Sequence, residues 1–269
     1  MSRSLLIVGA GLSGLFAAVH AARRGASVRL IAEGRGGLAL CHGCIDVWHD
    51  GDIRFALGRL DREHPLRLAG REALEQALEA FLHDMQACQL PFAGSLDRTW
   101  RLPTAVGSVH ETTAAPVSMT AGSLDDPGGI HLGQLTGLRD FSAHLAAAGL
   151  RSMAVEVRGT IELPLPSSPT ARDLYASEIA LALEEEGYRH EVARLWKPKT
   201  AHVRRLGLPA VLGRERSLEV FAGLEHELGL DLFEIPTLPP SLPGLRIEQA
   251  LRRLAVQTGV DIIEGPGVR

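Results

Sequence analysis

The chain has 269 residues, of which 45% are apolar and 22% charged, and its formal net charge is −4. This apolar content allows a sizeable core, in one large domain or two smaller ones, and argues against a disordered chain. The small net charge argues against a basic surface for nucleic acid or an anionic membrane. Three cysteines are too few for a disulfide scaffold and favour a reducing cytoplasm.

The first 33 residues predict a strand, a glycine turn, a helix and a second strand. Residues 5–8 and 27–32 are apolar runs typical of buried strands, and residues 12–19 repeat apolar side chains at helical spacing. This order is a βαβ unit, which requires a parallel sheet. Residues 4–22 carry no charge, which also suits a signal peptide or membrane anchor, but three glycines interrupt the run.

The turn has the glycine spacing of a dinucleotide-binding site. Gly9 allows the tight turn after the strand, Gly11 allows the backbone to approach a pyrophosphate, and Gly14 allows the helix to pack closely on the strand. The pyrophosphate then binds free N–H groups at the positive end of the helix. The predicted cofactor-binding residues of this turn are Gly9, Ala10, Gly11, Leu12, Ser13 and Gly14.

The second strand adds a carboxylate to this site. Glu33 lies 22 residues after Gly11, where an acid binds the ribose of a dinucleotide. A carboxylate there would repel the 2′-phosphate of NADP. The motif does not separate FAD from NAD, but its place at the N-terminus before a second glycine-rich loop, residues 34–43, favours a flavin. The alternative is a glycine-rich turn in a fold without a cofactor.

The second loop contains a C-x-x-C pair, Cys41 and Cys44, around His42 and Gly43. Such a pair serves as a redox dithiol or as half of a zinc site, but no second ligand pair is present and the pair does not open a helix. A simpler interpretation is two buried thiols beside a tight glycine turn. A functional one places the loop against the flavin ring, with Cys41, His42 and Gly43 at the ring edge. We expect no metal.

The rest of the chain predicts alternating elements. Helical periodicity covers residues 72–87, 138–148, 171–186, 215–228 and 247–258. Strands are expected at residues 153–157, 206–212, 232–235 and 261–263. Short β-like pieces near Ala105 and Pro116 predict a second, partly antiparallel layer. Because the last strand has just begun and has nowhere to pair beyond it, we expect the sheet to need more chain.

The predicted fold class is α/β, a Rossmann-like FAD/NAD(P)-binding parallel sheet with an inserted α+β second domain. Residues 1–100 are expected to form the N-terminal part of the flavin-binding domain. Residues 101–245 are expected to form an inserted substrate or cap domain. Residues 246–269 would return to the nucleotide domain and leave it incomplete.

Other polar residues give weaker indications. Arg246 follows a proline-rich loop and has the chemistry to hold a substrate phosphate or carboxylate, although an ordinary solvated or salt-bridged arginine is the alternative. His110, His131 and His144 are isolated in the sequence and are interpreted as surface or core histidines. The catalytic base therefore stays unassigned.

Four stretches together resemble the B subunit of the anaerobic glycerol-3-phosphate dehydrogenases, which are flavoproteins. They are residues 5–25, 33–48, 135–157 leading into 161–164, and 235–259. The first is common to flavoproteins, whereas the last two, in this order and spacing, are more specific. The resemblance covers essentially the whole chain. The chain departs from the family at Cys41 and His42, where the family loop is serine-rich. It also departs from the family in a further C-terminal segment, which family members carry and which closes over the flavin.

The resemblance implies a flavin-dependent, quinone-linked oxidoreductase subunit that oxidises sn-glycerol 3-phosphate to dihydroxyacetone phosphate. It implies two partners, a catalytic A subunit and an iron–sulfur C subunit that anchors the complex. It also implies a cytoplasmic chain, peripheral on the inner face of the cell membrane through these partners. The family is described with FMN, whereas the motif accommodates FAD. Two alternatives stay open: a generic FAD-dependent oxidoreductase of another small substrate, and a non-catalytic electron-relay or assembly subunit.

Overall fold

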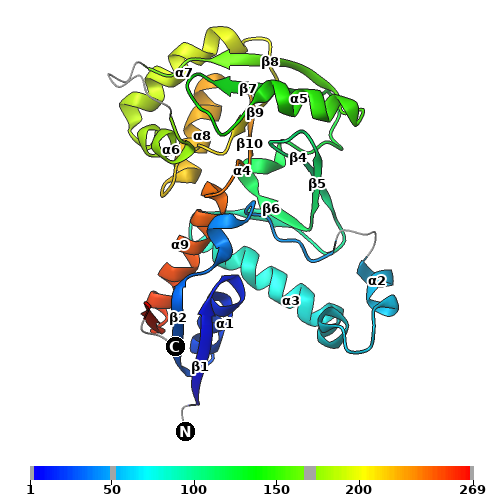
Figure 1. The fold of residues 1–269 in the computed structure, drawn as a ribbon, viewed down its shortest axis with the longest axis vertical. Helices are drawn as coiled ribbons and strands as arrows, with labels where there is room; N and C mark the ends of the chain where they lie inside the picture. Colours follow the sequence, from blue (N-terminus) through cyan, green and yellow to red (C-terminus); the bar gives the residue numbers. More distant parts are fainter. Residues whose placement is uncertain (1–2, 49–52, 167–173, 267–269) are drawn as a thin grey trace. The chain divides into compact units, whose positions relative to one another are not determined.

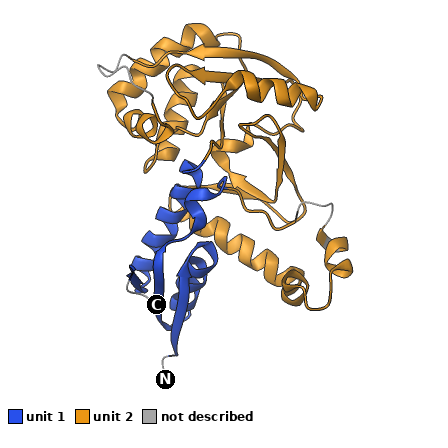
Figure 2. Ribbon diagram, viewed as in Figure 1, with its two compact units in different colours: residues 1–43, 239–269 blue, residues 44–238 orange. Residues whose placement is uncertain are grey.

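The computed structural model describes residues 3–48, 53–166 and 174–266 (Figure 1). The chain divides into two compact units, unit 1 with residues 1–43 and 239–269, and unit 2 with residues 44–238 (Figure 2). The sequence placed these divisions after residues 100 and 245. They lie elsewhere because helix α3, Pro65–Ala87, packs on strand β3, Phe92–Gly94, and both belong to unit 2.

Unit 1 is a parallel sheet in the order β1-β2-β11. Strand β1 is Ser4–Ala10, β2 is Ser27–Arg35 and β11 is Asp261–Glu264. Helix α1, Leu12–Arg23, connects the first two strands, and helix α9, Leu242–Gln257, precedes the third and packs against α1. A short 3₁₀ helix, η1, spans Gly37–Leu40. The predicted Rossmann-like α/β fold is confirmed.

The last strand pairs with β2 on one side and lies at an edge of the described sheet. Asp261 lies opposite Arg29 and Glu264 opposite Ala32, so β11 extends the sheet beside β2. The opposite edge is β1, where Leu6 and Val8 are 61% and 77% exposed. Apolar strands of parallel sheets are normally covered on both faces, so this edge is unusually bare.

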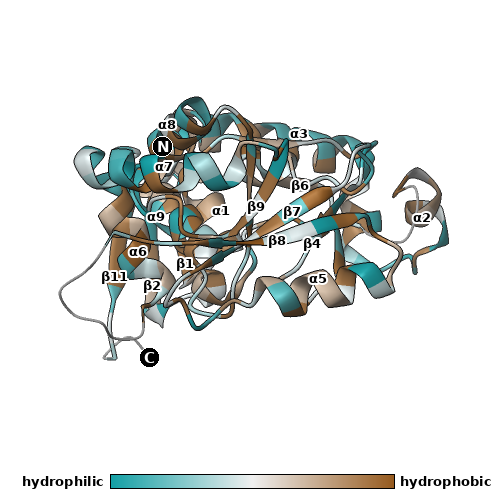
Figure 3. Ribbon diagram, turned by 90° about the horizontal axis from the view of Figure 1, so that it is seen from above, coloured by the Kyte–Doolittle hydropathy of each residue, from teal (hydrophilic) through white to brown (hydrophobic). Residues whose placement is uncertain are grey.

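The largest sheet of unit 2 is also parallel, in the order β10-β9-β7-β8. Its strands are β7, Ile130–Leu135; β8, Val157–Leu163; β9, Arg205–Pro209; and β10, Asp231–Ile235. The chain winds outward from β7 to β8, then returns past β7 to β9 and β10, so the winding reverses between β7 and β9. Strand β9 is buried along its whole length, and Figure 3 shows brown, hydrophobic segments among the strands of this sheet. The partly antiparallel layer expected near Ala105 and Pro116 is separate from this sheet, and two antiparallel strand pairs described below confirm it.

Helices join these strands. Helix α5, Ala143–Ser152, connects β7 to β8, and α8, Ser217–Leu228, connects β9 to β10. Between β8 and β9 lie two helices, α6, Ala176–Glu184, and α7, Glu186–Thr200. The single helix predicted to stop at Gly187 is wrong, because Gly187 lies in the first turn of α7. The predicted start of that helix, residues 171–173, lies outside the described residues.

Two predicted boundaries also shift. The helix expected over residues 138–148 starts at Ala143, where Ser142 caps it through its hydroxyl group. The strand expected at residues 153–157 starts only at Val157, because Ala154 adopts a positive φ of 60° that no strand contains. Strand β7 was not predicted at all.

Antiparallel pairs complete unit 2. Strand β3 pairs with β6, Ala114–Pro116, and β4, Trp100–Pro103, pairs with β5, Val109–Thr112. Helices α2, Ile53–Arg59, and α4, Val117–Thr120, flank α3 and β6. The helical periodicity expected over residues 72–87 gives α3 an apolar stripe, in which Leu78, Phe81 and Met85 are buried, whereas Leu74 and Leu82 are half-buried.

Residues 4–22, which also resembled an anchor, form β1 and most of α1. Among the described residues, no helix combines the length and apolar character that a membrane crossing requires.

Candidate functional site

The glycine turn between β1 and α1 has the geometry that the motif predicts. Gly9 has a φ of +104°, which side chains rarely adopt. A methyl group at Gly14 would overlap the carbonyl oxygen of Gly9, so the helix packs directly on the turn. A methyl group at Gly11 would meet no atom within 4 Å. The structure therefore leaves space at Gly11, where the backbone of the motif approaches a ligand.

The N-terminus of α1 is open to an anion. Gly11 is the N-cap residue, and no side chain in the described part of the chain caps the helix through a hydrogen bond. The first intrahelical bond runs from Leu15 N to the Gly11 carbonyl, so the N–H groups of Leu12, Ser13 and Gly14 have no intrahelical acceptor. These N–H groups and the helix dipole suit a phosphate group.

The pairing of strands β1 and β2 is irregular beside the glycine turn. Val8 lies opposite Ile31, but Ala10 lies opposite Arg35, so the ladder skips three residues of β2. Glu33 is one of these residues and is exposed. It therefore lies at the carboxyl end of β2 with a free approach, as a ribose-binding acid requires.

The second glycine loop packs against the first turn, which the sequence did not predict. A methyl group at Gly36 would lie 2.5 Å from Gly11 Cα and 2.7 Å from Gly11 N. On the other side of the loop, methyl groups at Gly43 and Gly244 would overlap Pro243 and the Leu38 carbonyl, respectively. The loop is therefore held between the turn and the start of α9. The adjacent glycines 36 and 37 were the signal in the sequence.

The C-x-x-C pair lies at the end of this loop. Gly43 has a φ of +83°, so the tight glycine turn is present. Neither Cys41 nor Cys44 is in a disulfide bond, and the first is half-buried and the second buried. Cys44 belongs to unit 2, where its sulfur lies 3.8 Å from that of Met119. The roles of Cys41, His42 and Gly43 beside a flavin ring stay predictions.

Arg246 is buried near the start of α9, with only 4% of its surface exposed. An ordinary solvated arginine is therefore the wrong interpretation of this residue. Its predicted contact with a substrate anion stays a prediction.

The helix N-termini at the winding reversal of unit 2 are occupied by the chain's own side chains. Gln134 Oε1 accepts a hydrogen bond of 2.9 Å from Ala143 N at the start of α5. Glu184 Oε1 accepts three, of 2.7, 2.6 and 2.9 Å, from the N–H groups of residues 214–216 before α8. In parallel sheets this edge commonly binds ligands. Here its N–H donors serve internal contacts.

Other buried charges of unit 2 also bind backbone groups. Glu234 accepts hydrogen bonds of 2.8 Å from Leu212 N and from the Ser118 hydroxyl. Arg205 donates to the carbonyl groups of Ala121, at 2.7 Å, and Ser123. Burial lowers the pKa of Arg205. These contacts hold the loops in place, so the charged groups of Glu234 and Arg205 have a structural role.

The histidines are not isolated in the structure. His110 Nε2 lies 3.2 Å from Asp46 Oδ1, a pairing of imidazole and carboxylate that can orient a general base. His131 stacks edge-on with His202 at 5.7 Å, and burial followed by repulsion from His202 lowers the pKa of His131. Sequence alone missed these pairs, because their members lie far apart along the chain.

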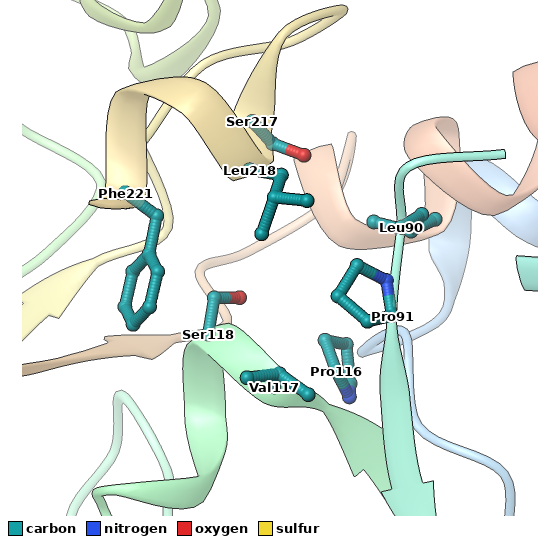
Figure 4. A pocket seen from close by; sticks show the side chains of 8 residues that line it. All are labelled: Leu90, Pro91, Pro116, Val117, Ser118, Ser217, Leu218 and Phe221. Carbon is teal, nitrogen blue, oxygen red and sulfur yellow. The ribbon is translucent and has the colours of Figure 1, made fainter. Parts of the chain in front are cut away.

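Two hollows in unit 2 differ in size. The smaller, of about 10 Å³, lies between Ser217, Leu218 and Phe221 of α8 and residues 116–118 (Figure 4), and holds at most one water. The larger, of about 440 Å³, is polar and lies at the start of β7 and β9, with Glu156 and Arg205 in its wall. Ligands of parallel sheets bind at the opposite ends of the strands. The glycine turn of unit 1 is therefore the candidate cofactor site.

Comparison with known proteins agrees with this assignment. A family model described as "FAD binding domain" matches residues 4–269. The chain is 32% identical to the probable B subunit of the anaerobic glycerol-3-phosphate dehydrogenase of Halobacterium salinarum, over 97% of this chain and 65% of the relative. It is 27% identical to the B subunit of the same enzyme of Vibrio cholerae, over 100% of this chain and 66% of the relative.

The chain thus spans about two thirds of the length of these relatives. No solved structure matches it. The family match covers both units and includes the turn, whose open Gly11 and uncapped helix suit a flavin dinucleotide. The chain belongs to the FAD-binding domain family.

Proposed function

We propose that this chain is the flavin-binding part of the B subunit of an anaerobic glycerol-3-phosphate dehydrogenase. Together with its partners it would oxidise sn-glycerol 3-phosphate to dihydroxyacetone phosphate and pass the electrons towards quinone. The observation that carries this proposal is the open glycine turn of unit 1 in a chain similar over nearly its full length to such subunits.

The chain's own residues would bind and orient the cofactor. The N–H groups of residues 12–14 would hold a phosphate, and Glu33 would accept hydrogen bonds from a ribose. Cys41, His42 and Gly43 would line the edge of the ring. A bound flavin supplies the hydride and electron transfer itself.

The partners follow from the same similarity. A catalytic A subunit and an iron–sulfur, membrane-anchoring C subunit would complete the complex. The chain would then be cytoplasmic and peripheral on the inner face of the cell membrane.

The absorbance spectrum of the purified chain tests the cofactor. We expect flavin bands at roughly 370 and 450 nm, present on purification or after reconstitution with FAD or FMN. A protein that stays colourless after reconstitution with both would contradict the proposal.

Turnover measurements test whether the chain itself is catalytic. Glycerol 3-phosphate oxidation by the chain with an artificial electron acceptor would assign catalysis to it. Activity that appears only with the catalytic partner present would indicate an electron-relay or assembly role. Flavin reduction by a different small substrate, with none by glycerol 3-phosphate, would indicate another oxidoreductase.

A further inference from the structure

One cation of unit 1 lies directly beside the glycine turn. Arg35 pairs with Ala10 across the β1–β2 ladder, one residue before Gly11. The next residue, Gly36, lies against the Gly11 backbone. The Arg35 side chain is 68% exposed. Arg35 therefore lies at the carboxyl end of β2, two residues after Glu33 and beside the turn.

A buried carboxylate pairs with Arg35. Glu248 of α9 has a side chain only 3% exposed, and its Oε1 lies 3.7 Å from Arg35 Nε. Its Oε2 is buried and has no hydrogen-bond partner within the described residues. A buried carboxylate oxygen without a donor is costly, so Glu248 has an open position for a second N–H group.

Glu248 is itself fixed by a second ion pair. Arg252, one helical turn further along α9, donates through Nε to Glu248 Oε1 at 2.9 Å and through Nη1 to Glu264 of β11 at 2.8 Å. Arg252 therefore fixes the Glu248 carboxylate, and Arg35 is the second arginine that pairs with it.

A dinucleotide bound at the glycine turn would need a cation nearby to balance its charge. A dinucleotide would bring two phosphate charges to the turn, and Glu33 adds a third negative charge. The turn itself supplies only neutral N–H groups. An arginine between the ribose acid and the turn would offset this repulsion and bind a phosphate through two N–H groups.

We propose that Arg35 binds the adenosine-side phosphate of a flavin dinucleotide and that Glu248 is the positioning residue that orients its guanidinium group. This inference rests on the proposed flavin function and goes beyond it, because it selects FAD over FMN. FMN lacks the adenosine half, so the Arg35–Glu248 pair has nothing to recognise in it.

Titration of the purified chain with FAD, FMN and ADP tests the role of Arg35. We expect Arg35→Gln to weaken FAD and ADP binding about tenfold, the loss of one charge-assisted phosphate contact, and to change FMN binding by less than about twofold. Arg29→Gln is the matched control. Arg29 lies on the same strand, is 60% exposed, and pairs with a carboxylate of its own, Asp261, at 2.7 Å.

The outcomes separate the two proposals. Equal FAD affinity in the Arg35→Gln and Arg29→Gln chains overturns the inference and leaves the flavin function standing. So does a wild-type chain that binds FMN but neither FAD nor ADP. A chain that binds no flavin overturns the proposed function. The titration with ADP then still tests whether Arg35 binds a phosphate.

A double-mutant cycle tests Glu248. We expect Glu248→Gln to weaken FAD binding about threefold and to leave FMN unchanged, and the double variant with Arg35→Gln to bind FAD no more weakly than Arg35→Gln alone. Additive losses would show that Glu248 is merely structural. Glu264→Gln, which removes the other partner of Arg252, is the control. Should Glu248→Gln unfold, Glu248→Asp withdraws the carboxylate from Arg35 and is expected to give the same FAD-specific loss.

Discussion

Gly11 and Gly14 lie three residues apart in one motif but meet opposite surroundings. A methyl group at Gly14 would overlap the Gly9 carbonyl oxygen, whereas one at Gly11 would meet empty space. Gly14 is therefore required by the fold, and Gly11 by what binds there. The motif alone does not show this division, because the spacing treats both glycines alike.

This difference predicts how two alanine substitutions behave. Gly14→Ala should destabilise the chain by about 1–3 kcal/mol, because backbone must move to admit the methyl group. Gly11→Ala should leave the melting temperature nearly unchanged and weaken FAD binding at least about tenfold, since its methyl group would occupy the space of the pyrophosphate. Calorimetric melting and FAD titration check both. Wild-type FAD affinity in Gly11→Ala would contradict the assignment of the site.

Helix α6 and the start of α8 are joined by a single carboxylate. Glu184, the last residue of α6, receives the N–H groups of residues 214–216. Burial raises the pKa of Glu184, but these three hydrogen bonds outweigh burial, and the net result is a lowered pKa. The sequence does not show this contact, because Glu184 lies in an acidic run at residues 184–186 and the groups that it binds lie thirty residues away.

A pH dependence follows for these two helices. Because the folded-state pKa of Glu184 lies below its ordinary value of 4.5, its stabilisation is complete above pH 4.5 and is lost as the pH falls through the folded-state pKa. Glu184→Gln should lower stability by about 2 kcal/mol at pH 7, the value of hydrogen bonds to a charged group. Its melting temperature should also fall less steeply than the wild type's on acidification.

The control for this test is Glu185→Gln, which changes the exposed neighbouring residue. Melting curves of the three chains between pH 7 and about pH 3 provide the comparison. Parallel acid profiles for wild type and Glu184→Gln would show that the carboxylate contributes nothing through its charge.

At the scale of the whole molecule, unit 2 is one continuous stretch, residues 44–238, with its own parallel sheet and covering helices. A stretch with its own core is expected to fold alone. We predict that residues 44–238, expressed separately, unfold cooperatively, as measured by circular dichroism at helical and aromatic wavelengths. A broad, non-cooperative melt would show that unit 2 needs unit 1.

The sequence predicted unit 1 better than unit 2, for physical reasons. In unit 1 the signals are local: an apolar run, the glycines of the turn, and a helix ending before Gly25. In unit 2 the decisive features are distant. Strand β7 contains His131, Gly133 and Gln134, so its apolar pattern is weak, and only its pairing with β8 and β9 defines it.

The same reasoning separates the parts of the candidate site. Gly9, Gly11, Gly14 and Glu33 follow from spacing along one βαβ unit. The packing of Gly36 on Gly11 and the link from Glu248 to Arg35 join residues that no local pattern connects, the second pair from opposite ends of the sequence. Periodicity carries no signal for such contacts, because it reports only which face of an element is apolar.

The insertion between β2 and α9 has a consequence for synthesis on the ribosome. Strands β1 and β2 emerge first, but β11 follows only after the whole of unit 2. At 5–20 residues per second this delay lasts roughly 10–40 s, long enough for unit 2 to reach its native state. During that time the nascent cofactor sheet has two unsatisfied edges, and Leu6 and Val8 are on one of them. The start of this chain is therefore the segment on which chaperones should act.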